Sequence, residues 1–387
     1  MASVSTFTVE PRESNARDRL GDARLRIIHT VSSLQGGGME QFVLRLAESQ
    51  RLRGHDASVV AITPGPLLEI ARQKAVPTVV LHGERPAERI GHCAAHFAIY
   101  RPDIVHCHNP TALHYATVAK IASRGRLVFT DHAQTKGIIR MGSAFEWPLV
   151  DAFAAVSGET AKHCVDIGYR GTPEVVYNGV AFAPARRARA DVRAELGIGG
   201  RVVGINVASF FPVKAQDVLV RAAAVLKKAG VPVTILFLGE GAARASVEDL
   251  AERLGLGPQE ARFLGFRNDV PDLLSAADFF VLPSRGEGFP MSILEAMSHL
   301  LPVVCTPVGG NPELVIDGEH GRLVPVDDPG GLAAAIGALV EDEGLRQRLG
   351  DAGHARVTGE FTFDRTAEKY EAMYRRALRA PRRFVIV

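Results

Sequence analysis

The sequence has few cysteines, no long apolar run and almost no net charge, and each shortage excludes a class of protein. Its four cysteines, Cys93, Cys107, Cys164 and Cys305, form no C-x-x-C pair. This is typical of free thiols in a reducing compartment and not of a disulfide scaffold. No apolar run reaches the roughly 18 residues that a membrane-spanning helix needs. The net charge of +2 gives no indication of nucleic-acid binding.

The first residues also lack the apolar segment of a secretory signal, so we expect residues 1–23 to form a polar tail and the protein to be cytoplasmic. Arginines gather at residues 186–189 and 375–383. Solvated helix faces explain both groups most simply. A weak peripheral attraction to the inner face of an anionic membrane is the alternative interpretation.

What the chain does have is length and a regular alternation of patterns. Its 387 residues, 47% hydrophobic and 23% charged, predict a globular protein with about two or three domains. Helical spacing occurs at 39–53, 111–123, 330–340, 345–357 and 363–380. Apolar runs typical of buried strands occur at 25–31, 57–62, 78–81, 103–106, 127–130, 152–156, 174–177, 202–207, 233–238, 262–264, 278–282, 303–305 and 321–324.

Strands alternating with helices predict an α/β protein, in which helices wrap parallel sheets. A connector rich in Ala, Arg, Pro and Gly at 181–200 interrupts the alternation. We therefore expect two doubly wound, Rossmann-like domains with a cleft between them, at residues 24–185 and 186–362. In such sheets ligands lie beyond the carboxyl ends of the strands.

The most informative segment is 287–295, Glu-Gly-Phe-Pro-Met-Ser-Ile-Leu-Glu, directly after a predicted strand. Pro290 stands where a helix would begin, and a helix start presents backbone N–H groups and a positive dipole end to a phosphate. From Pro290 to Glu295 the helix rises about 7.5 Å, at 1.5 Å per residue. Glu287 and Glu295 are therefore spaced to bind the two ends of a diphosphate compound such as a nucleotide sugar.

Each of these carboxylates also has a simpler explanation. Glu287 could cap the helix, and Glu295 could face solvent. A helical wheel places Glu295, Ser298 and His299 opposite an apolar arc of Ile293, Leu294, Ala296, Met297, Leu300 and Leu301.

Other strand ends carry candidate residues. Gly36–Gly38 follows the first strand and opens a helix, which favours close approach of an anion, although a tight turn is the alternative. It is not G-x-G-x-x-G, which disfavours a dehydrogenase. The segment at 239–244 also lacks the third glycine and indicates only a strand-to-helix turn. Lys214 lies between a strand and a helix, where its ammonium can reach a phosphate, although a solvated surface lysine is commoner.

Histidines follow two further strands. His106 and His108 end one strand and His132 follows the next. With His92, Cys93, His96 and His114 they match no zinc spacing, so we expect no metal site. We expect such a histidine to donate a hydrogen bond to a substrate hydroxyl or phosphate, while a satisfied core histidine is the alternative for His106.

Together these features resemble the retaining glycosyltransferases of family 4, also called glycosyl transferases group 1, which have the GT-B fold. The resemblance covers about residues 24–374. It rests on the E-x7-E pair Glu287 and Glu295 and on segments 34–40, 106–108, 130–132, 177–180, 263–266, 282–290 and 301–313.

The resemblance implies a role for each matching residue of this chain. Glu287 would hold the hydroxyls of the transferred sugar, and Glu295 the ribose hydroxyls. Lys214 and the backbone of Gly288, Phe289 and Pro290 would bind the diphosphate. The backbone near Phe266 and Arg267 would meet the base, Gly37 and Gly38 the donor phosphate, and His132 the reacting sugar. A last helix, at 363–387, would cross back to the first domain.

One feature departs from the family pattern. An arginine usually precedes the lysine as a second cation on the diphosphate, but residues 209–211 are Ser, Phe and Phe. Either Lys214 acts alone or another arginine, such as Arg285, replaces the missing one. The loss is expected to weaken donor binding.

The implied activity is that of a hexosyltransferase which moves a sugar from a UDP- or GDP-sugar to a saccharide or lipid-linked acceptor, with no metal and no other cofactor. UDP-glucose, UDP-N-acetylglucosamine and GDP-mannose all fit, and the family favours cell-envelope or exopolysaccharide glycans. The sequence leaves the linkage and the oligomeric state open. A nucleotide-sugar epimerase, a phosphorylase and a non-catalytic sugar-nucleotide binder are the alternatives. A hydrolase that uses the two carboxylates is disfavoured, because they flank a phosphate-binding helix start.

Overall fold

The structure is a computed structural model that describes residues 23–83, 85–132, 146–166, 169 and 171–381. The chain divides into two compact units. The first contains residues up to 155, residues 161–176 and residues from 367 onwards. The second contains residues 156–160 and 177–366.

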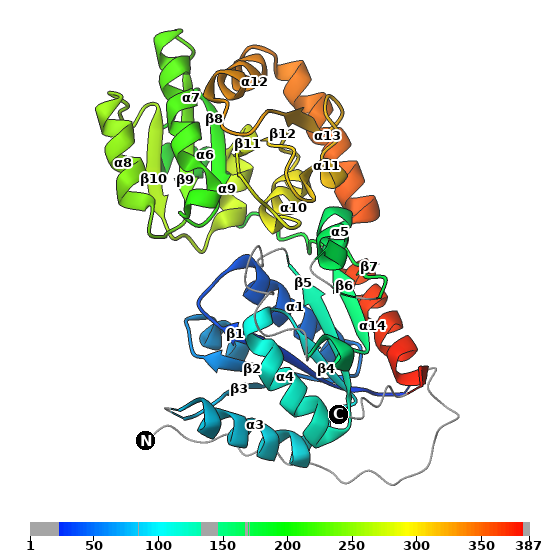
Figure 1. Ribbon diagram of the computed structural model, residues 1–387. Coiled ribbons are helices and arrows are strands. Elements are labelled where there is room, and N and C mark those ends of the chain that lie inside the picture. Colours follow the sequence, from blue (N-terminus) through cyan, green and yellow to red (C-terminus); the bar gives the residue numbers. More distant parts are fainter. Residues whose placement is uncertain (1–22, 84, 133–145, 167–168, 170, 382–387) are drawn as a thin grey trace. The chain divides into compact units, whose positions relative to one another are not determined.

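The first unit is built on a parallel sheet of seven strands in the order β3-β2-β1-β4-β5-β6-β7 (Figure 1). Its strands are β1 Arg26–Ser33, β2 Asp56–Thr63, β3 Thr78–Val80, β4 Ile104–Cys107, β5 Arg126–Asp131, β6 Ala152–Ala155 and β7 Glu174–Val175. Its helices are α1 Gly38–Leu52, α2 Leu67–Gln73, α3 Pro86–Tyr100, α4 Pro110–Ser123 and the short η1 Trp147–Leu149. The chain passes from the second unit to the first within α5 Gly158–Asp166.

The second unit contains a parallel sheet of six strands in the order β10-β9-β8-β11-β12-β13. Its strands are β8 Val202–Val207, β9 Val233–Leu238, β10 Ala261–Gly265, β11 Phe279–Leu282, β12 Val303–Cys305 and β13 Gly321–Leu323. Its helices are α6 Arg189–Glu195, η2 Pro212–Lys214, α7 Gln216–Lys228, α8 Arg244–Arg253, α9 Val270–Ala276, α10 Met291–Ser298, α11 Asn311–Leu314, α12 Pro329–Glu341 and α13 Glu343–Glu360.

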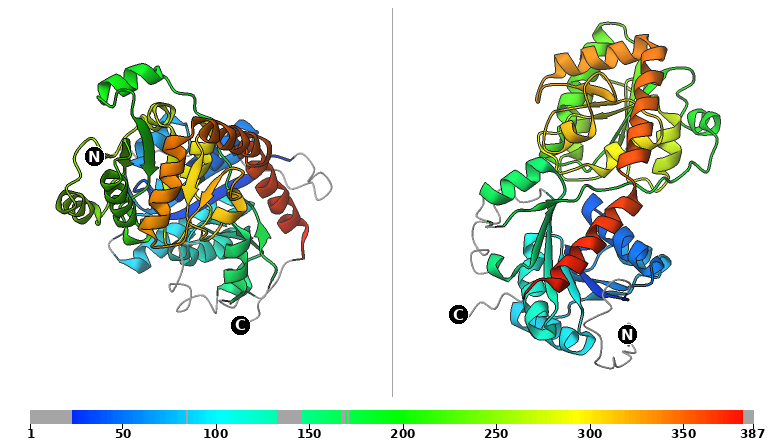
Figure 2. Two further views of the ribbon diagram at one scale, coloured as in Figure 1. Left: turned by 90° about the horizontal axis from the view of Figure 1, so that it is seen from above. Right: turned by 90° about the vertical axis from the view of Figure 1, so that its right-hand side faces the viewer.

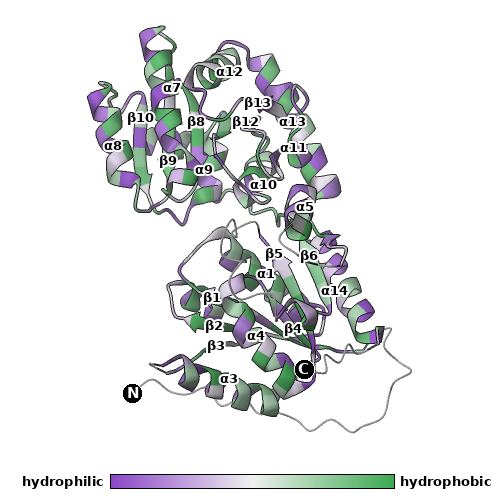
Figure 3. Cartoon of the chain, viewed as in Figure 1, coloured by the Kyte–Doolittle hydropathy of each residue, from purple (hydrophilic) through white to green (hydrophobic). Residues whose placement is uncertain are grey.

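Both faces of the second sheet are buried, which explains the continuous apolar runs of its strands. Along β11, Phe280 and Leu282 belong to one apolar cluster, whereas Phe279 and Val281 belong to another. Successive side chains of a strand point to opposite faces, so these two clusters are the cores on the two sides of the sheet. Strands of both units are mainly hydrophobic, while the helices carry both hydrophobic and hydrophilic residues (Figure 3).

The α/β prediction is confirmed: every predicted strand is present, with ends shifted by two residues or fewer. The helices α1, α4, α12 and α13, and the last helix α14 Phe363–Arg379, likewise match the predicted segments. The turn at 239–244 joins β9 to α8.

The last helix, α14 Phe363–Arg379, belongs to the first unit from Ala367 onwards, as the predicted crossing requires. Its buried Tyr370 and Tyr374 both contact His106 of β4, and the helix is drawn in red in Figure 2.

The boundaries between the two units differ from the expected residues 185 and 362. Tyr177–Val180 belongs to the second unit because Val180 pairs with Thr362 in a parallel bridge. The Val180 N–H donates to Phe361 O at 2.9 Å, and the Phe363 N–H donates to Val180 O at 3.0 Å. The connector at 181–200 therefore lies wholly in the second unit, where it forms α6.

Candidate functional site

In the second unit, the predicted site residues gather beyond the carboxyl end of β11. The strand ends at Leu282, and α10 begins at Met291 with Pro290 as an extended N-cap residue (φ −71°, ψ 121°). The fixed φ of proline suits this extended backbone, although proline offers no side-chain acceptor to cap the helix. The helix start predicted from the sequence is therefore present, with its first N–H groups beyond the strand end.

Glu287 lies in this turn and is held by two donors. Its side chain is only 5% exposed, and its Oε1 accepts hydrogen bonds from Ser284 Oγ at 2.6 Å and from Lys214 Nζ at 2.7 Å. Both donors use the same oxygen. Among the described residues, none donates a hydrogen bond to Oε2. A carboxylate oriented in this way can accept hydrogen bonds from sugar hydroxyls.

Lys214 comes from η2, which Ala215 ends in a left-handed conformation (φ 53°). The structure thus joins Lys214 to Glu287, although the sequence had suggested different ligand groups for the two. An ammonium has three N–H donors, so the bond to Glu287 leaves two for a phosphate. Its charge, however, is already partly balanced by the carboxylate.

Arg285, the alternative second cation, already has carboxylate partners. Its guanidinium bonds Asp217 at 3.0 Å and 3.2 Å, Asp327 at 2.7 Å and Pro212 O at 2.6 Å. The two carboxylates raise the pKa of Arg285. Since these partners occupy the group, the structure favours the alternative in which Lys214 acts without Arg285.

The turn at 284–290 is braced by the loop after β12, a feature that the sequence did not reveal. Thr306 Oγ1 donates to Ser284 O at 2.5 Å, and the Gly310 N–H donates to Gly288 O at 2.8 Å. Gly309 has φ +55°, and a Cβ there would lie 1.9 Å from Glu287 O. The pair Gly309-Gly310 is the signal in the sequence that is consistent with so close an approach of the two backbones.

Phe289 contributes its backbone to this site, because its side chain belongs to the core. The ring is 3% exposed and packs on Tyr177 and Phe361 at centroid distances of 4.9 Å and 5.4 Å. Its carbonyl accepts a hydrogen bond from Asn178 Nδ2 at 2.9 Å. Any role of Phe289 toward a ligand therefore falls to its N–H.

Glu295 is partly exposed on α10, as expected, but the helical wheel was wrong for two neighbours. Ser298 is buried (2% exposed), and its Oγ donates to Glu295 O at 2.7 Å. Leu300 is 51% exposed. For Leu300 the reason is that α10 ends at Ser298 and Leu300 has a left-handed backbone (φ 61°), so the wheel does not extend to it.

Phe266 and Arg267 follow β10. The Phe266 side chain is 64% exposed, which leaves its ring free to pack against a flat ligand group. Arg267 makes a bidentate pair with Asp269 at 2.7 Å and 2.5 Å. Its side chain is thus held beside the turn, and the backbone role predicted for it stays a prediction.

In the first unit, the glycine turn at the start of α1 already has an anionic neighbour at Gly37. Gly37 is the N-cap residue of α1, and a Cβ there would lie 2.4 Å from Glu40 Oε2. Burial raises the pKa of Glu40, to which Ser33 Oγ donates at 3.4 Å. A phosphate at this helix start would have to displace the Glu40 carboxylate. A Cβ on Gly38 would meet nothing within 4 Å, so that side of the turn is open among the described residues.

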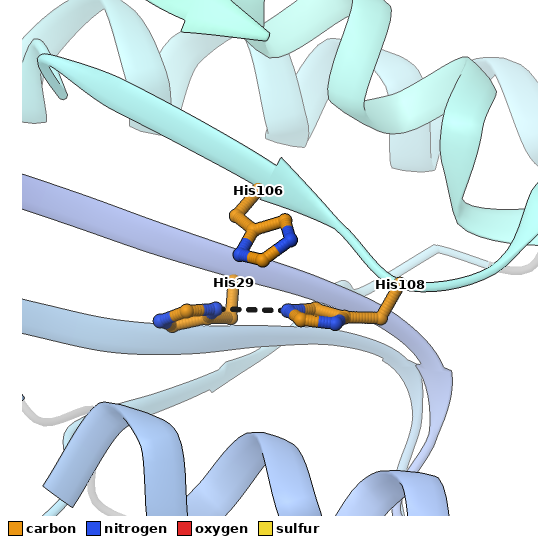
Figure 4. Close-up of side chains that lie close together, drawn as sticks. All are labelled: His29, His106 and His108. Carbon is orange, nitrogen blue, oxygen red and sulfur yellow. Dashed lines mark hydrogen bonds between the residues drawn. The ribbon is translucent and has the colours of Figure 1, made fainter. Parts of the chain in front are cut away.

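His106 and His108, at the carboxyl end of β4, form a buried cluster with His29, which the sequence did not reveal (Figure 4). His29 and His106 are directly opposite in the pairing of β1 with β4. His29 Nδ1 and His108 Nε2 are 2.9 Å apart, and His108 Nδ1 and His132 Nε2 are 3.2 Å apart. Each ring nitrogen of His29, His106 and His108 has a hydrogen-bond partner, so hydrogen bonding alone accounts for this cluster.

Burial keeps these rings neutral. It lowers the pKa of His29 to about 4 and that of His132 to about 3, and lowers those of His106 and His108 well below the usual value. An imidazolium would be costly here because it would lose its hydration.

These shifts predict that the protein loses stability as the pH falls from 6.5 to 5. In this window the unfolded chain binds protons on histidines with ordinary pKa values, whereas the folded chain does not, so the unfolding free energy rises with pH. Each such histidine contributes about 1 kcal/mol per pH unit. Urea unfolding at pH 7, 6 and 5 measures the effect, and equal unfolding free energies at pH 7 and 5 would contradict it.

In the part of the chain that the structure describes, no helix combines the length and the hydropathy needed to cross a membrane.

Comparison with known proteins places both units in one family. Residues 36–183 match the family described as Glycosyltransferase Family 4, and residues 201–342 match Glycosyl transferases group 1. The phosphatidyl-myo-inositol mannosyltransferase of Mycolicibacterium smegmatis is 30% identical over 80% of this chain and 83% of its own length. The lipopolysaccharide core biosynthesis glycosyltransferase LpsE of Rhizobium meliloti is 32% identical, over 54% of this chain and 60% of its own length.

Solved structures share the fold at lower identity. Anabaena HepE in complex with UDP and glucose has a TM-score of 0.82 and 23% identity, over 90% of this chain and 99% of that one. The two parallel sheets flanked by helices thus match a GT-B protein.

Proposed function

The chain belongs to the family 4 glycosyltransferases of the GT-B fold, and from this membership we propose that it transfers a hexose from a nucleoside diphosphate sugar with retention of configuration. The observation that carries the proposal is the position of Glu287. It is oriented by Ser284 and Lys214 beyond the carboxyl end of β11, beside the start of α10.

Each predicted donor residue has a role in this proposal. Lys214 and the N–H groups at the start of α10 bind the diphosphate, and Glu287 accepts hydrogen bonds from the transferred sugar. Glu295, about one turn into α10, binds the ribose hydroxyls. The exposed ring of Phe266 lies beside the base, with the backbone of Arg267. In the first unit, Gly37 and Gly38 approach the donor phosphate, and His132 contacts the reacting sugar.

The chemistry that we propose breaks the bond between the anomeric carbon and the phosphate oxygen, and forms a bond to an acceptor hydroxyl on the same face. The departing diphosphate oxygen takes the proton of that hydroxyl, so no protein nucleophile and no metal ion are needed. Charge develops on the diphosphate in the transition state. The ammonium of Lys214 and the dipole of α10 stabilise this charge, usually the largest contribution to catalysis.

The comparisons support the choice of donor and acceptor to be tested first. HepE has been solved with UDP-glucose, and named relatives act in lipopolysaccharide core synthesis and on phosphatidyl-myo-inositol. We propose a UDP- or GDP-sugar donor and a saccharide or lipid-linked acceptor of the cell envelope or an exopolysaccharide. The transfer takes place in the cytoplasm, at the inner face of the membrane when the acceptor is lipid-linked.

A thermal-shift panel followed by product analysis tests this function. Ligands that bind the native state raise the melting temperature, so UDP, GDP, UDP-glucose, UDP-N-acetylglucosamine and GDP-mannose are compared at equal concentration. We expect one nucleotide and its sugar to raise it, and that donor to yield a glycoside only when an acceptor is added. No shift with any member of the panel would contradict the proposal.

A non-catalytic sugar-nucleotide binder is the second candidate, because Lys214 is already paired with Glu287 and Arg285 is held by aspartates. Donor binding without any glycoside product would favour it. A product that forms without an acceptor would instead indicate an epimerase, and one formed with free phosphate a phosphorylase.

A further inference from the structure

A continuous row of hydrogen bonds runs through the core of the first unit and ends at His132. Apart from His132, which is partly buried, its members are at most 1% exposed. They come from α1, from α14, and from β1, β4 and β5 or the residues just after these strands. In order, the row consists of Tyr370, Thr130, His106, Tyr374, Gln50, His29, His108 and His132.

Which group donates in each hydrogen bond of the row can be deduced by starting at Tyr370. Thr130 Oγ1 donates to Tyr370 OH at 3.3 Å, which uses the one hydroxyl hydrogen of Thr130. Toward His106 Nε2, at 2.7 Å, Thr130 therefore acts as an acceptor, and His106 carries its proton on Nε2. A neutral imidazole has one donor and one acceptor, so His106 Nδ1 accepts from Tyr374 OH at 2.7 Å.

In the middle of the row the hydrogen bonds are donated in the same sense along the row. Tyr374 OH accepts from Gln50 Nε2 at 3.3 Å, which turns the amide oxygen Oε1 toward His29. His29 Nε2–H then donates to Gln50 Oε1 at 2.8 Å, and His29 Nδ1 accepts from His108. The direction deduced from Thr130 and the orientation of the Gln50 amide thus agree.

The remaining links carry this direction to His132. His108 donates from Nε2 to His29, so its Nδ1 accepts from His132 Nε2–H at 3.2 Å. The proton of a neutral His132 therefore lies on Nε2 and its lone pair on Nδ1. Among the described residues, none forms a hydrogen bond to this Nδ1. Burial disfavours the imidazolium form of all four histidines, and only neutral rings transmit a direction.

We propose that Gln50 and Tyr374 are positioning residues that act through His29 and His108 to hold His132 with its proton on Nε2 and an acceptor lone pair on Nδ1. With this lone pair His132 accepts a hydrogen bond from a sugar hydroxyl and disfavours a phosphate oxygen. The expectation that such a histidine donates to its ligand is revised accordingly. The inference rests on the proposed function for the identity of the ligand, but the tautomer itself does not depend on it.

Ring-nitrogen NMR tests the tautomer directly. The full chain, labelled with ¹⁵N in histidine, is recorded at pH 7 without ligand, and the His132 signals are assigned by their loss in His132→Gln. We expect a protonated Nε2 and a bare Nδ1. A bare Nε2 with a protonated Nδ1, or an equal mixture of the two, would overturn the inference even if neither Gln50 variant folds.

Two replacements of Gln50 test the positioning role. Gln50→Leu removes the acceptor of His29, so we expect both His132 tautomers and about a tenfold lower kcat, with the KM for the donor changed less than twofold. Gln50→Glu keeps an acceptor oxygen and is expected to retain the tautomer and most of the rate. Gln41→Leu, on the exposed face of the same helix, is the matched control.

The outcomes separate this inference from the proposed function. If the wild-type protein has a single His132 tautomer and a folded Gln50→Leu variant keeps it, the proposed role of Gln50 is overturned. Absence of glycosyl transfer would contradict the proposed function, but would leave the expected ring-nitrogen spectrum and its response to Gln50→Leu in place.

Discussion

Replacement of Glu287 by alanine and of Lys214 by alanine is expected to lower glycosyl transfer at least tenfold each, while the protein stays folded. A tenfold loss corresponds to about 1.4 kcal/mol of transition-state stabilisation. Glu287→Ala removes the acceptor for the sugar hydroxyls, and Lys214→Ala removes the ammonium that stabilises the departing diphosphate.

The ion pair between Glu287 and Lys214 predicts that the effects of the two replacements on activity are not additive. Glu287 Oε1 and Lys214 Nζ are 2.7 Å apart, so each single replacement also disturbs the other residue. The double variant should therefore lose less activity than the product of the two single losses. Steady-state kinetics with the best donor of the panel measures all the variants.

Lys227→Ala is the matched control, because Lys227 makes an ion pair with Glu260 at 3.3 Å and its side chain is 44% exposed. We expect unchanged turnover there. Unchanged turnover in both Glu287→Ala and Lys214→Ala would dismiss the proposed site.

The second large effect is expected at Gly309. Gly309→Ala introduces a Cβ that would lie 1.9 Å from Glu287 O, at a backbone angle of φ +55°. The left-handed conformation costs roughly 1–2 kcal/mol for an L-residue, and overpacking typically costs about 1–3 kcal/mol more. We expect the unfolding free energy to fall by about 2–5 kcal/mol, and donor binding to weaken because the turn at 284–290 must move.

Gly318→Ala separates the two contributions. Gly318 also has a positive φ of 78°, but a Cβ there meets nothing within 4 Å. Denaturant unfolding should show only the conformational cost in this control, with thermal shifts by the donor nucleotide unchanged. Equal losses of stability in both variants, with donor binding intact in both, would contradict the bracing role of Gly309.

The sequence predicted the sheets well because most of their central strands are buried and so carry continuous apolar runs. It also brought Glu287, Pro290 and Glu295 together, since they lie within a few residues of one strand end. The contact of Lys214 with Glu287 was not predictable, because it depends on how the loop after β8 packs against the loop after β11.

The histidine row was missed for a related reason. His29 meets His106 only because β4 pairs with β1, a strand order that periodicity does not reveal. Tyr370 and Tyr374 lie one turn apart on a helix predicted correctly, but their partners are more than two hundred residues away. Leu300 was misplaced because a helical wheel does not indicate where a helix ends.

The passage of α14 into the first unit has a practical consequence for dissecting the protein. A fragment cut at residue 185 to isolate the N-terminal half would lack the helix that contributes Tyr370 and Tyr374, and would leave His106 Nδ1 without its hydrogen bond to the Tyr374 hydroxyl. Neither half of this molecule corresponds to one uninterrupted stretch of the gene. An autonomous N-terminal half would need residues 367–381 joined to it by a designed linker.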